Sequence, residues 1–207
     1  MDEVVLIRPF TRKKAPIGLF SIASILNHNG YSVKFLDQTV TDNFYQKFIN
    51  ALENNSLCVG ITSMTGPQLK YALDCARLVK QINKKIPVIL GGVHATLFAE
   101  QPLKSGLFDI VVKGEGEFTM LELVKALNNG KRLDNIAGLA FKEKGRVKVS
   151  SGQEYIDLKA LPPINYKLFD IEKYIENSPL FGKKSKRSFL INTGRGCSYR
   201  CKFCYCS

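Results

Sequence analysis

Residues 57–76 read LCVGITSMTGPQLKYALDCA, and this stretch shows the pattern that organises residues 1–130. Its first five residues form a short apolar run, which is typical of a strand buried on both faces of a parallel sheet. A loop of small and polar residues follows. Leu69, Ala72, Leu73 and Ala76 then recur at the spacing of one helix face. The stretch therefore predicts a strand, a loop and a helix in succession.

The same unit recurs on both sides of this stretch. Further apolar runs lie at residues 4–7, 33–36, 88–90 and 110–112, and helical stripes lie at 19–26, 44–52 and 120–127. The connection 94–107 is less regular, and Asn29-Gly30 and Asn129-Gly130 supply helix stops. Strands that alternate with helices predict an α/β fold with a doubly wound, parallel, five-stranded sheet of order 2-1-3-4-5, flavodoxin-like or Rossmann-like.

Ligands of such a sheet bind beyond the carboxyl ends of the strands, and the crevice opens between the first and third strands. The loops at these ends are residues 9–16, 37–41, 62–67, 91–96 and 113–117. They are rich in Gly, Ser, Thr and Pro, which lets the backbone approach a ligand closely. The candidate cofactor-binding residues are Pro9, Pro16, Gly18, Ser63, Met64, Thr65, Gly91, Gly92, His94, Gly114, Glu115, Gly116 and Glu117.

The rest of the chain has a different pattern. Residues 139–149 predict an antiparallel hairpin around Lys144-Gly145, and residues 155–187 predict a linker with a short helix near 169–175. Residues 188–193 predict a new strand that leads into Gly194. We therefore expect an α/β domain at 1–135, a hairpin and linker at 136–187, and a further domain that starts at 188–207.

Composition narrows the class of protein. Of the 207 residues 45% are hydrophobic, which is enough for a packed core. No run approaches the roughly 18–20 apolar residues of a membrane span, and the acidic start is unlike a secretory signal, so we expect a cytoplasmic protein with no membrane partner. The net charge of +12 is spread along the chain, which favours solvated loops over a polyanion site. A nucleic-acid partner is therefore not expected.

Cysteines crowd the end of the chain with the spacing Cys197-x3-Cys201-x2-Cys204. Thiolates are the usual ligands of iron–sulfur clusters, and three of them can hold three irons of a cubane while the fourth iron stays open. A tetrahedral zinc site with Cys206 as fourth ligand is the alternative. The spacing predicts a metal site made by the three cysteines.

Residues 193–204, TGRGCSYRCKFC, closely resemble the signature of radical S-adenosylmethionine (SAM) enzymes. In that family the three cysteines hold a 4Fe-4S cluster, and SAM chelates the open iron. An electron, delivered by a reductant such as flavodoxin or ferredoxin, cleaves SAM to a 5′-deoxyadenosyl radical. The resemblance implies these cofactors here, with Cys197, Cys201 and Cys204 as cluster ligands and residues 188–207 as the start of the barrel.

The resemblance extends upstream. LGGVHAT at 90–96, FDIVVKGEGE at 108–117 and LKALPP at 158–163 look like the cobalamin-binding domain that precedes many radical SAM barrels. Cobalamin domains of the methionine synthase type carry a cobalt-binding His after the first strand, but the loop 9–16 has none. Only His28 and His94 exist, and we expect His28 at the surface and His94 beside the pocket. A vestigial domain that binds no cobalamin stays an alternative.

A second departure is length, because the chain ends three residues after Cys204. We therefore expect the N-terminal portion of a cobalamin-type radical SAM enzyme, truncated and inactive alone. Its reaction would be methyl transfer, cyclisation or rearrangement at an unactivated carbon of a small, anionic substrate. The alternatives are a non-catalytic cobalamin- or metal-binding module and a tRNA-modifying methylthiotransferase. Methylthiotransferases carry further cluster cysteines in the N-terminal domain. Here only Cys58 and Cys75 precede the cysteine motif, and neither lies in a suitable context.

Overall fold

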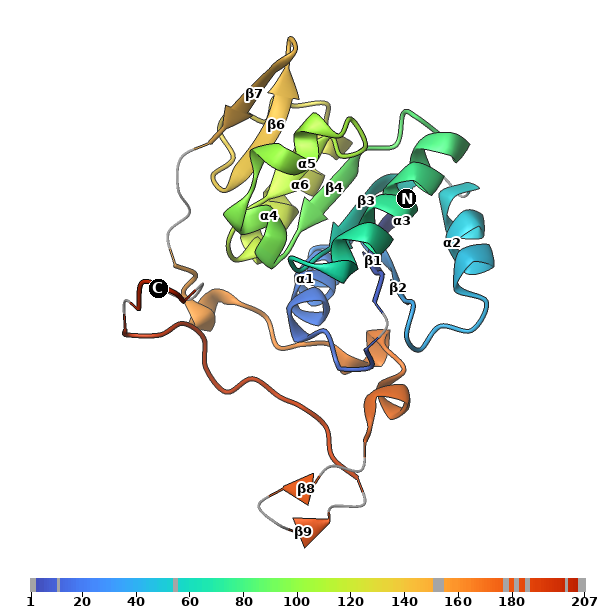
Figure 1. Ribbon diagram of the computed structural model, residues 1–207, viewed down its shortest axis with the longest axis vertical. Helices are drawn as coiled ribbons and strands as arrows, with labels where there is room; N and C mark the ends of the chain where they lie inside the picture. Colours follow the sequence, from blue (N-terminus) through green and yellow to red (C-terminus); the bar gives the residue numbers. More distant parts are fainter. Residues whose placement is uncertain are drawn as a thin grey trace.

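The computed structural model describes residues 3–10, 12–53, 56–150, 155–176, 179–180, 183–184, 187–199 and 201–204 (Figure 1). The strands are β1 Glu3–Arg8, β2 Ser32–Asp37, β3 Ser56–Thr62, β4 Val88–Gly91, β5 Ile110–Val112, β6 Leu139–Glu143, β7 Arg146–Val149, β8 Pro179–Leu180 and β9 Lys183–Lys184. The α-helices are α1 Ile17–His28, α2 Phe44–Glu53, α3 Pro67–Ile82, α4 Val93–Leu97, α5 Glu100–Lys104 and α6 Gly116–Asn128. Three 3₁₀ turns follow: η1 Leu158–Ala160, η2 Tyr166–Leu168 and η3 Ile171–Tyr174.

The central sheet has the order β2-β1-β3-β4-β5-β6-β7. Its first five strands are parallel and confirm the predicted fold class and the order 2-1-3-4-5. The predicted count of five strands is wrong, because β6 pairs antiparallel with β5 and β7 pairs with β6. Without β6 the outer edge of β5 would expose unpaired backbone groups, and the hairpin satisfies them.

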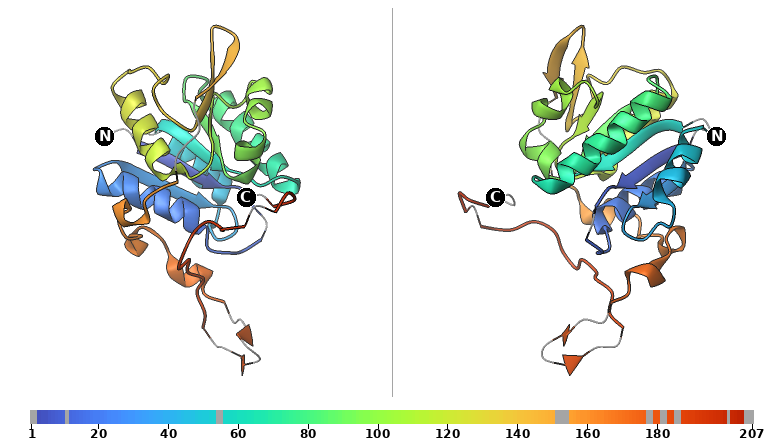
Figure 2. Two further views of the ribbon diagram at one scale, coloured as in Figure 1. Left: turned by 90° about the vertical axis from the view of Figure 1, so that its left-hand side faces the viewer. Right: turned by 45° about the vertical axis from the view of Figure 1, so that its right-hand side comes forward.

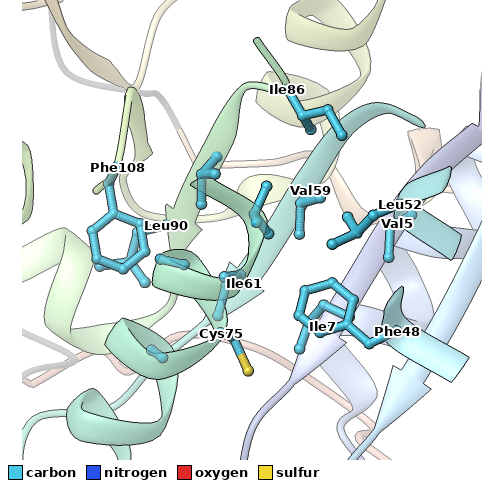
Figure 3. Close-up of a cluster of buried hydrophobic side chains, with 14 of the residues drawn as sticks. Val5, Ile7, Phe48, Leu52, Val59, Ile61, Cys75, Ile86, Leu90 and Phe108 are labelled. Atoms are coloured by element: carbon cyan, nitrogen blue, oxygen red, sulfur yellow. The ribbon is translucent and has the colours of Figure 1, made fainter. Parts of the chain in front are cut away.

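Helices cover both faces of the sheet (Figure 1 and Figure 2). Side chains alternate along each strand, so Val5 and Ile7 enter one core while Val4 and Leu6 enter the other. The first core contains side chains of α2, α3, α4 and α5, and Figure 3 shows Phe48 and Cys75 within it. The second core contains side chains of α1 and α6. Burial on both faces explains why the strands read as continuous apolar runs.

The helix boundaries follow local signals. Asn29 and Asn129 are the C-caps of α1 and α6, and the next residue in each case is a glycine with a positive φ, 85° at Gly30 and 60° at Gly130. The irregular connection after β4 forms two helices of five residues each, α4 and α5. No helix in the described part of the chain has the length and apolar character needed to cross a bilayer.

The segment after the hairpin differs from its prediction. The expected helix near 169–175 is a 3₁₀ turn, η3, and the expected strand 188–193 does not form. Among residues 188–193 only Ser188 forms a β-bridge, with Glu176. A strand needs a paired neighbour for its backbone groups, and residues 189–193 have none in the described structure.

Candidate functional site

A cavity of about 490 Å³ opens at the carboxyl edge of the sheet, on the side covered by α1 and α6. Its floor includes Leu6 of β1 and Gly60 of β3, so it lies where the strand order reverses. The other lining residues come from strand ends, the two helices, two loops and the C-terminal segment: Gly18, Leu19, Ile22, Ile61, Thr62, Ile89, Gly91, Gly92, Val93, Val112, Gly114, Glu115, Gly116, Glu117, Met120, Asn192 and Arg195.

Glycines create much of this space. A Cβ at Gly60 would lie 2.9 Å from Leu6 Cδ2, so any larger residue in the floor would require the Leu6 side chain to shift. Gly18 and Gly91 are the opposite case, because a Cβ at either position would have no heavy atom within 4 Å. Side chains at these two positions would extend into the open volume. The cavity is therefore an apolar slot that is kept open by missing side chains.

The rim of the cavity is built by backbone contacts between strand ends. Gly92 has φ +91°, and a Cβ there would lie 2.6 Å from the carbonyl oxygen of Ser63. The Ser63 N–H donates to the Gly91 carbonyl at 3.0 Å, and the His94 N–H donates to the Ser63 carbonyl at 3.2 Å. The close approach of these loops requires glycine at position 92 and fixes the start of α4.

Two carboxylates stand at the mouth. Glu117 lies in the first turn of α6 and is buried, with 2% of its surface exposed, and Glu115 is the N-cap residue of that helix. Arg195 pairs with both, at 2.6 Å from Nη2 to Glu117 Oε1 and 3.4 Å from Nη1 to Glu115 Oε1. The hydrogen bond to Glu117 raises the pKa of Arg195 above its ordinary value, so the guanidinium stays charged.

His94 lies near the cavity but does not line it. The side chain is buried, and its Nδ1 lies 3.3 Å from Thr65 Oγ1 while Nε2 is buried without a hydrogen-bond partner among the described residues. Burial lowers the pKa of His94, so the imidazole is neutral at pH 7. His28 is exposed in the last turn of α1.

The predicted cofactor-binding residues divide into two groups. Those that line the cavity are Gly18, Gly91, Gly92, Gly114, Glu115, Gly116 and Glu117. Those that do not are Pro9, Pro16, Ser63, Met64, Thr65 and His94. In the second group Pro16 is the N-cap residue of α1, Ser63 is fully buried, and Met64 is 55% exposed.

The sequence did not predict the apolar wall of the cavity, or that Asn192 and Arg195 line it. Leu19 and Ile22 belong to a helical stripe that predicts core packing, and nothing local separates core from cavity wall. Arg195 lies 80 positions from Glu115, and no pattern links the two. A basic residue two positions before the first loop cysteine does not by itself predict a contact with α6.

The cysteine loop is at the surface. Cys197, Cys201 and Cys204 are exposed, and the Cys204 N–H donates to the Cys201 carbonyl at 2.9 Å. Gly196 has φ +81°, which turns the chain just before Cys197. Among the residues that the structure describes, no three His, Cys, Asp or Glu side chains lie close enough together to hold a metal ion. The cluster therefore stays a prediction. Residues 200 and 205–207, with Cys206, lie outside the described residues.

The two upstream cysteines are buried on opposite faces of the sheet, Cys75 in the first core and Cys58 in the second. Burial raises the pKa of each thiol to about 12. A metal needs thiolates that converge on one point, and the sheet separates these two sulfurs. Cys58 and Cys75 therefore do not form a metal site together.

Known proteins share this architecture. A family model described as the B12 binding domain matches residues 4–124. The chain is 32% identical over 192 residues to an uncharacterized methyltransferase of Pyrococcus horikoshii, covering 91% of this chain and 40% of that protein. It is 31% identical over 199 residues to an anaerobic magnesium-protoporphyrin IX monomethyl ester cyclase of Rubrivivax gelatinosus, covering 91% of this chain and 34% of that protein.

Solved structures agree on the fold. The cobalamin-dependent S-adenosylmethionine radical enzyme OxsB, with aqua-cobalamin and S-adenosylmethionine bound, superposes with a TM-score of 0.78 at 23% identity, covering 99% of this chain and 28% of that one. The radical methyltransferase TsrM of Kitasatospora setae gives 0.70 at 21% identity, covering 100% of this chain and 42% of that one. The chain therefore spans less than half the length of these relatives, and it belongs to the B12-binding domain family.

Proposed function

We propose that this chain is the cobalamin-binding part of a radical SAM enzyme that transfers a methyl group, or cyclises or rearranges its substrate, at an unactivated carbon. The observation that carries the proposal is the glycine-walled cavity at the point where the strand order of a B12-binding-family sheet reverses. Small-molecule sites enclose about 300–1,000 Å³ and are mostly apolar, and this cavity has that character.

The residues present fit a large ligand with a flat apolar part. Gly91, Gly92, Gly114 and Gly116 would let the cofactor contact the backbone at the rim, and Gly18 leaves the slot beside α1 open. Bound cobalamin would supply a carrier for methyl groups. The apolar wall would exclude water from the slot, and the α6 N-terminus with Glu115 and Glu117 would set the charge at its mouth.

No histidine of the described chain is placed to ligate cobalt from this cavity. The loop after β1 has none, and His94 is turned toward Thr65. We infer that neither His28 nor His94 would ligate cobalt if cobalamin bound in this cavity.

The C-terminal cysteines would hold the 4Fe-4S cluster, with the open iron as the site for SAM. Exposed basic residues in the loop after β1, Arg12, Lys13 and Lys14, suit an anionic substrate. Since the chain spans less than half of the relatives named above, the reaction belongs to the whole protein. We expect no SAM cleavage by the 207-residue chain alone.

Titration of the chain with hydroxocobalamin, followed by corrin absorption, tests the proposal. We expect binding, and we expect Gly18→Leu to weaken it at least about tenfold, which is about 1.4 kcal/mol. Leucine is a better helix former than glycine, so this variant should fold at least as well as the parent. Gln46→Leu, which places the same side chain on the exposed face of α2, is the matched control and should bind normally.

Two results would contradict the proposal. The absence of binding by the folded chain would support the vestigial alternative. Equal binding by the Gly18→Leu variant would place the ligand elsewhere. The inference about His94 is tested separately. Nitrogen splitting in the electron paramagnetic resonance spectrum of the cob(II)alamin-loaded chain that disappears in His94→Ala would identify His94 as a ligand and contradict the inference.

A further inference from the structure

The C-terminal segment returns to the cavity. After β9 the chain runs back toward the α/β layers (Figure 1 and Figure 2), and Asn192 and Arg195 join the cavity lining. Beyond the bridge at Ser188 it lacks strand pairing in the described residues, and Leu190 and Ile191 are 55% and 60% exposed. Something other than sheet pairing or apolar burial must therefore hold Asn192 and Arg195 at the cavity.

Arg195 supplies that contact. Its Nη2 lies 2.6 Å from Glu117 Oε1 and 3.3 Å from Ser21 Oγ, and its Nη1 lies 3.4 Å from Glu115 Oε1. Only 25% of the arginine side chain is exposed. Both ends of the guanidinium are thus engaged by residues of α1 and of the α6 N-terminus. A planar fork with several donors suits this arrangement better than a single ammonium group would.

The acceptor side is built for a cation. The Glu117 side chain is 3% exposed, and a buried carboxylate is costly unless a partner neutralises it. The N-terminus of α6 offsets part of that charge, and Arg195 offsets more. Glu115 is also fixed, because its Oε2 accepts a hydrogen bond from the Ile156 N–H at 3.0 Å. Glu115 is therefore held by a contact that does not involve Arg195.

Arg195 lies close to the cysteine loop in the sequence, so its contact with α6 also places that loop. It precedes the first loop cysteine, Cys197, by two residues, and the turn at Gly196 separates them. A guanidinium fixed at the mouth of the cavity therefore fixes the start of the cysteine loop at the same place.

We propose that Arg195 is a positioning residue that docks the cysteine loop on the rim of the cavity through Glu117 and Glu115. Which cofactors are brought together rests on the proposed function, but the docking itself needs neither of them. Arg195 acts through the placement of the loop and does not touch the reacting atoms.

The chain has no tryptophan, so a single reporter can follow the loop. Tyr199 is 74% exposed and lies just after Cys197, and Tyr199→Trp changes little else. We expect the fluorescence anisotropy of this variant, without metal or cobalamin, to fall when Arg195→Gln is added. Arg195→Lys should restore part of the loss. Glu117→Gln should lower the anisotropy as well, and the two glutamine substitutions together should do no more than either alone.

Arg187→Gln is the matched control. It removes an arginine of the same segment that pairs with Glu172, where both side chains are well exposed, and the anisotropy should not change. Unfolding curves check that the variants fold. If Glu117→Gln destabilises the chain because it removes the buried charge, Arg195→Gln still tests the docking. Unchanged anisotropy in Arg195→Gln, or an equal loss in Arg187→Gln, would overturn the proposal.

Hydroxocobalamin separates the two proposals. Corrin absorption reports binding, and quenching of the introduced tryptophan by energy transfer to the corrin reports how near the loop lies. We expect Arg195→Gln to reduce the quenching of the cobalamin-saturated chain. If cobalamin fails to bind while the anisotropy still depends on Arg195, the proposed function fails and the docking stands. If cobalamin binds and neither signal depends on Arg195, the docking fails and the proposed function stands.

Discussion

Single residues decide how the segment after the hairpin is anchored, and Asp37 at the end of β2 is the clearest case. Its carboxylate is fully buried and accepts hydrogen bonds from Arg8 Nη1 at 2.8 Å and from the Tyr174 hydroxyl at 2.9 Å. Thr39 donates to the other oxygen through both its N–H and its hydroxyl. Burial and the neighbouring Asp37 raise the pKa of Tyr174, so its hydroxyl stays a donor. One carboxylate thus ties β1, β2 and η3 together.

We expect Asp37→Asn to lower the free energy of unfolding by about 3–5 kcal/mol, because Arg8 would keep a buried charge without its counterion. Urea unfolding followed by circular dichroism measures the loss. Asp74→Asn is the control, since its pair with Arg77 is exposed on both sides and such pairs contribute about 1 kcal/mol or less. Equal losses in the two variants would show that the Asp37 network adds nothing to stability.

The buried thiols of Cys58 and Cys75 predict a pH dependence. Burial raises both pKa values from 9.0 to about 12, so the unfolded chain loses these protons at lower pH than the folded chain does. The stabilisation is complete below pH 9 and is lost as the pH rises toward 12. Each thiol should lower the free energy of unfolding by up to about 1.4 kcal/mol per pH unit in that window.

Urea unfolding of the parent and of Cys58→Ala at pH 8 and pH 10 checks this. The difference in stability between the two proteins should shrink at pH 10, because alanine has no proton to lose. The exposed loop cysteines are replaced by serine in both proteins, so that the two proteins differ only at Cys58. A difference that stays constant with pH would show that Cys58 ionises equally in both states.

Among the elements, the hairpin β6–β7 closes the edge of the sheet. Leu139, Ala140 and Phe141 are all buried, and β6 hydrogen-bonds with the whole of β5. The outer strand, β7, carries charged side chains. Its Lys148 pairs with Asp134 at 2.8 Å and also with Glu143. Charged side chains on an edge strand discourage pairing with another chain, so the hairpin both completes and protects the sheet.

We expect a chain that ends at residue 150 to be folded and monomeric, and one that ends at residue 135 to be destabilised and to associate. The shorter chain exposes the β5 edge and loses three buried side chains, each worth about 1–3 kcal/mol. Size-exclusion chromatography and thermal unfolding compare the two. A shorter chain that is equally stable and monomeric would show that the first five strands form a complete unit.

At the scale of the whole molecule, the chain passes around the α/β layers and returns to them twice. Phe169 stacks on Phe20 of α1 at 4.0 Å between ring centroids, and further on Arg195 reaches the cavity mouth. Both contacts lie on the face that α1 and α6 cover. The cysteine loop therefore starts on the same side of the sheet as the cavity.

We expect anaerobic incubation of the chain with iron and sulfide to give a brown protein with the charge-transfer absorption of a 4Fe-4S cluster, and Cys201→Ala to abolish it. Cys75→Ala, which removes a buried thiol of the core, is the control and should keep the cluster. The loop is exposed, so oxygen should destroy the cluster readily. A purified chain that holds stoichiometric zinc and takes up no iron would show that the loop is a zinc site.

The sequence by itself determined the order and type of nine of the first eleven elements, and it showed the remaining two, α4 and α5, only as an irregular connection. Apolar runs and helical stripes are local signals, because burial on two faces or on one face sets their period. The same logic placed the glycines of residues 91–92 and 114–116 at the carboxyl edge, where they line the cavity. The cysteine spacing is also a local signal, and it predicts a metal site without knowledge of the fold.

The tertiary structure alone decided the rest. Only the folded sheet shows that β6 pairs with β5, that residues 189–193 have no strand partner among the described residues, and that His94 contacts Thr65 and does not line the cavity. The same holds for the pairing of Arg195 with Glu117, which lies far away in the chain. Pairing and ion contacts depend on how distant segments approach in space, and a local pattern carries no information about that approach.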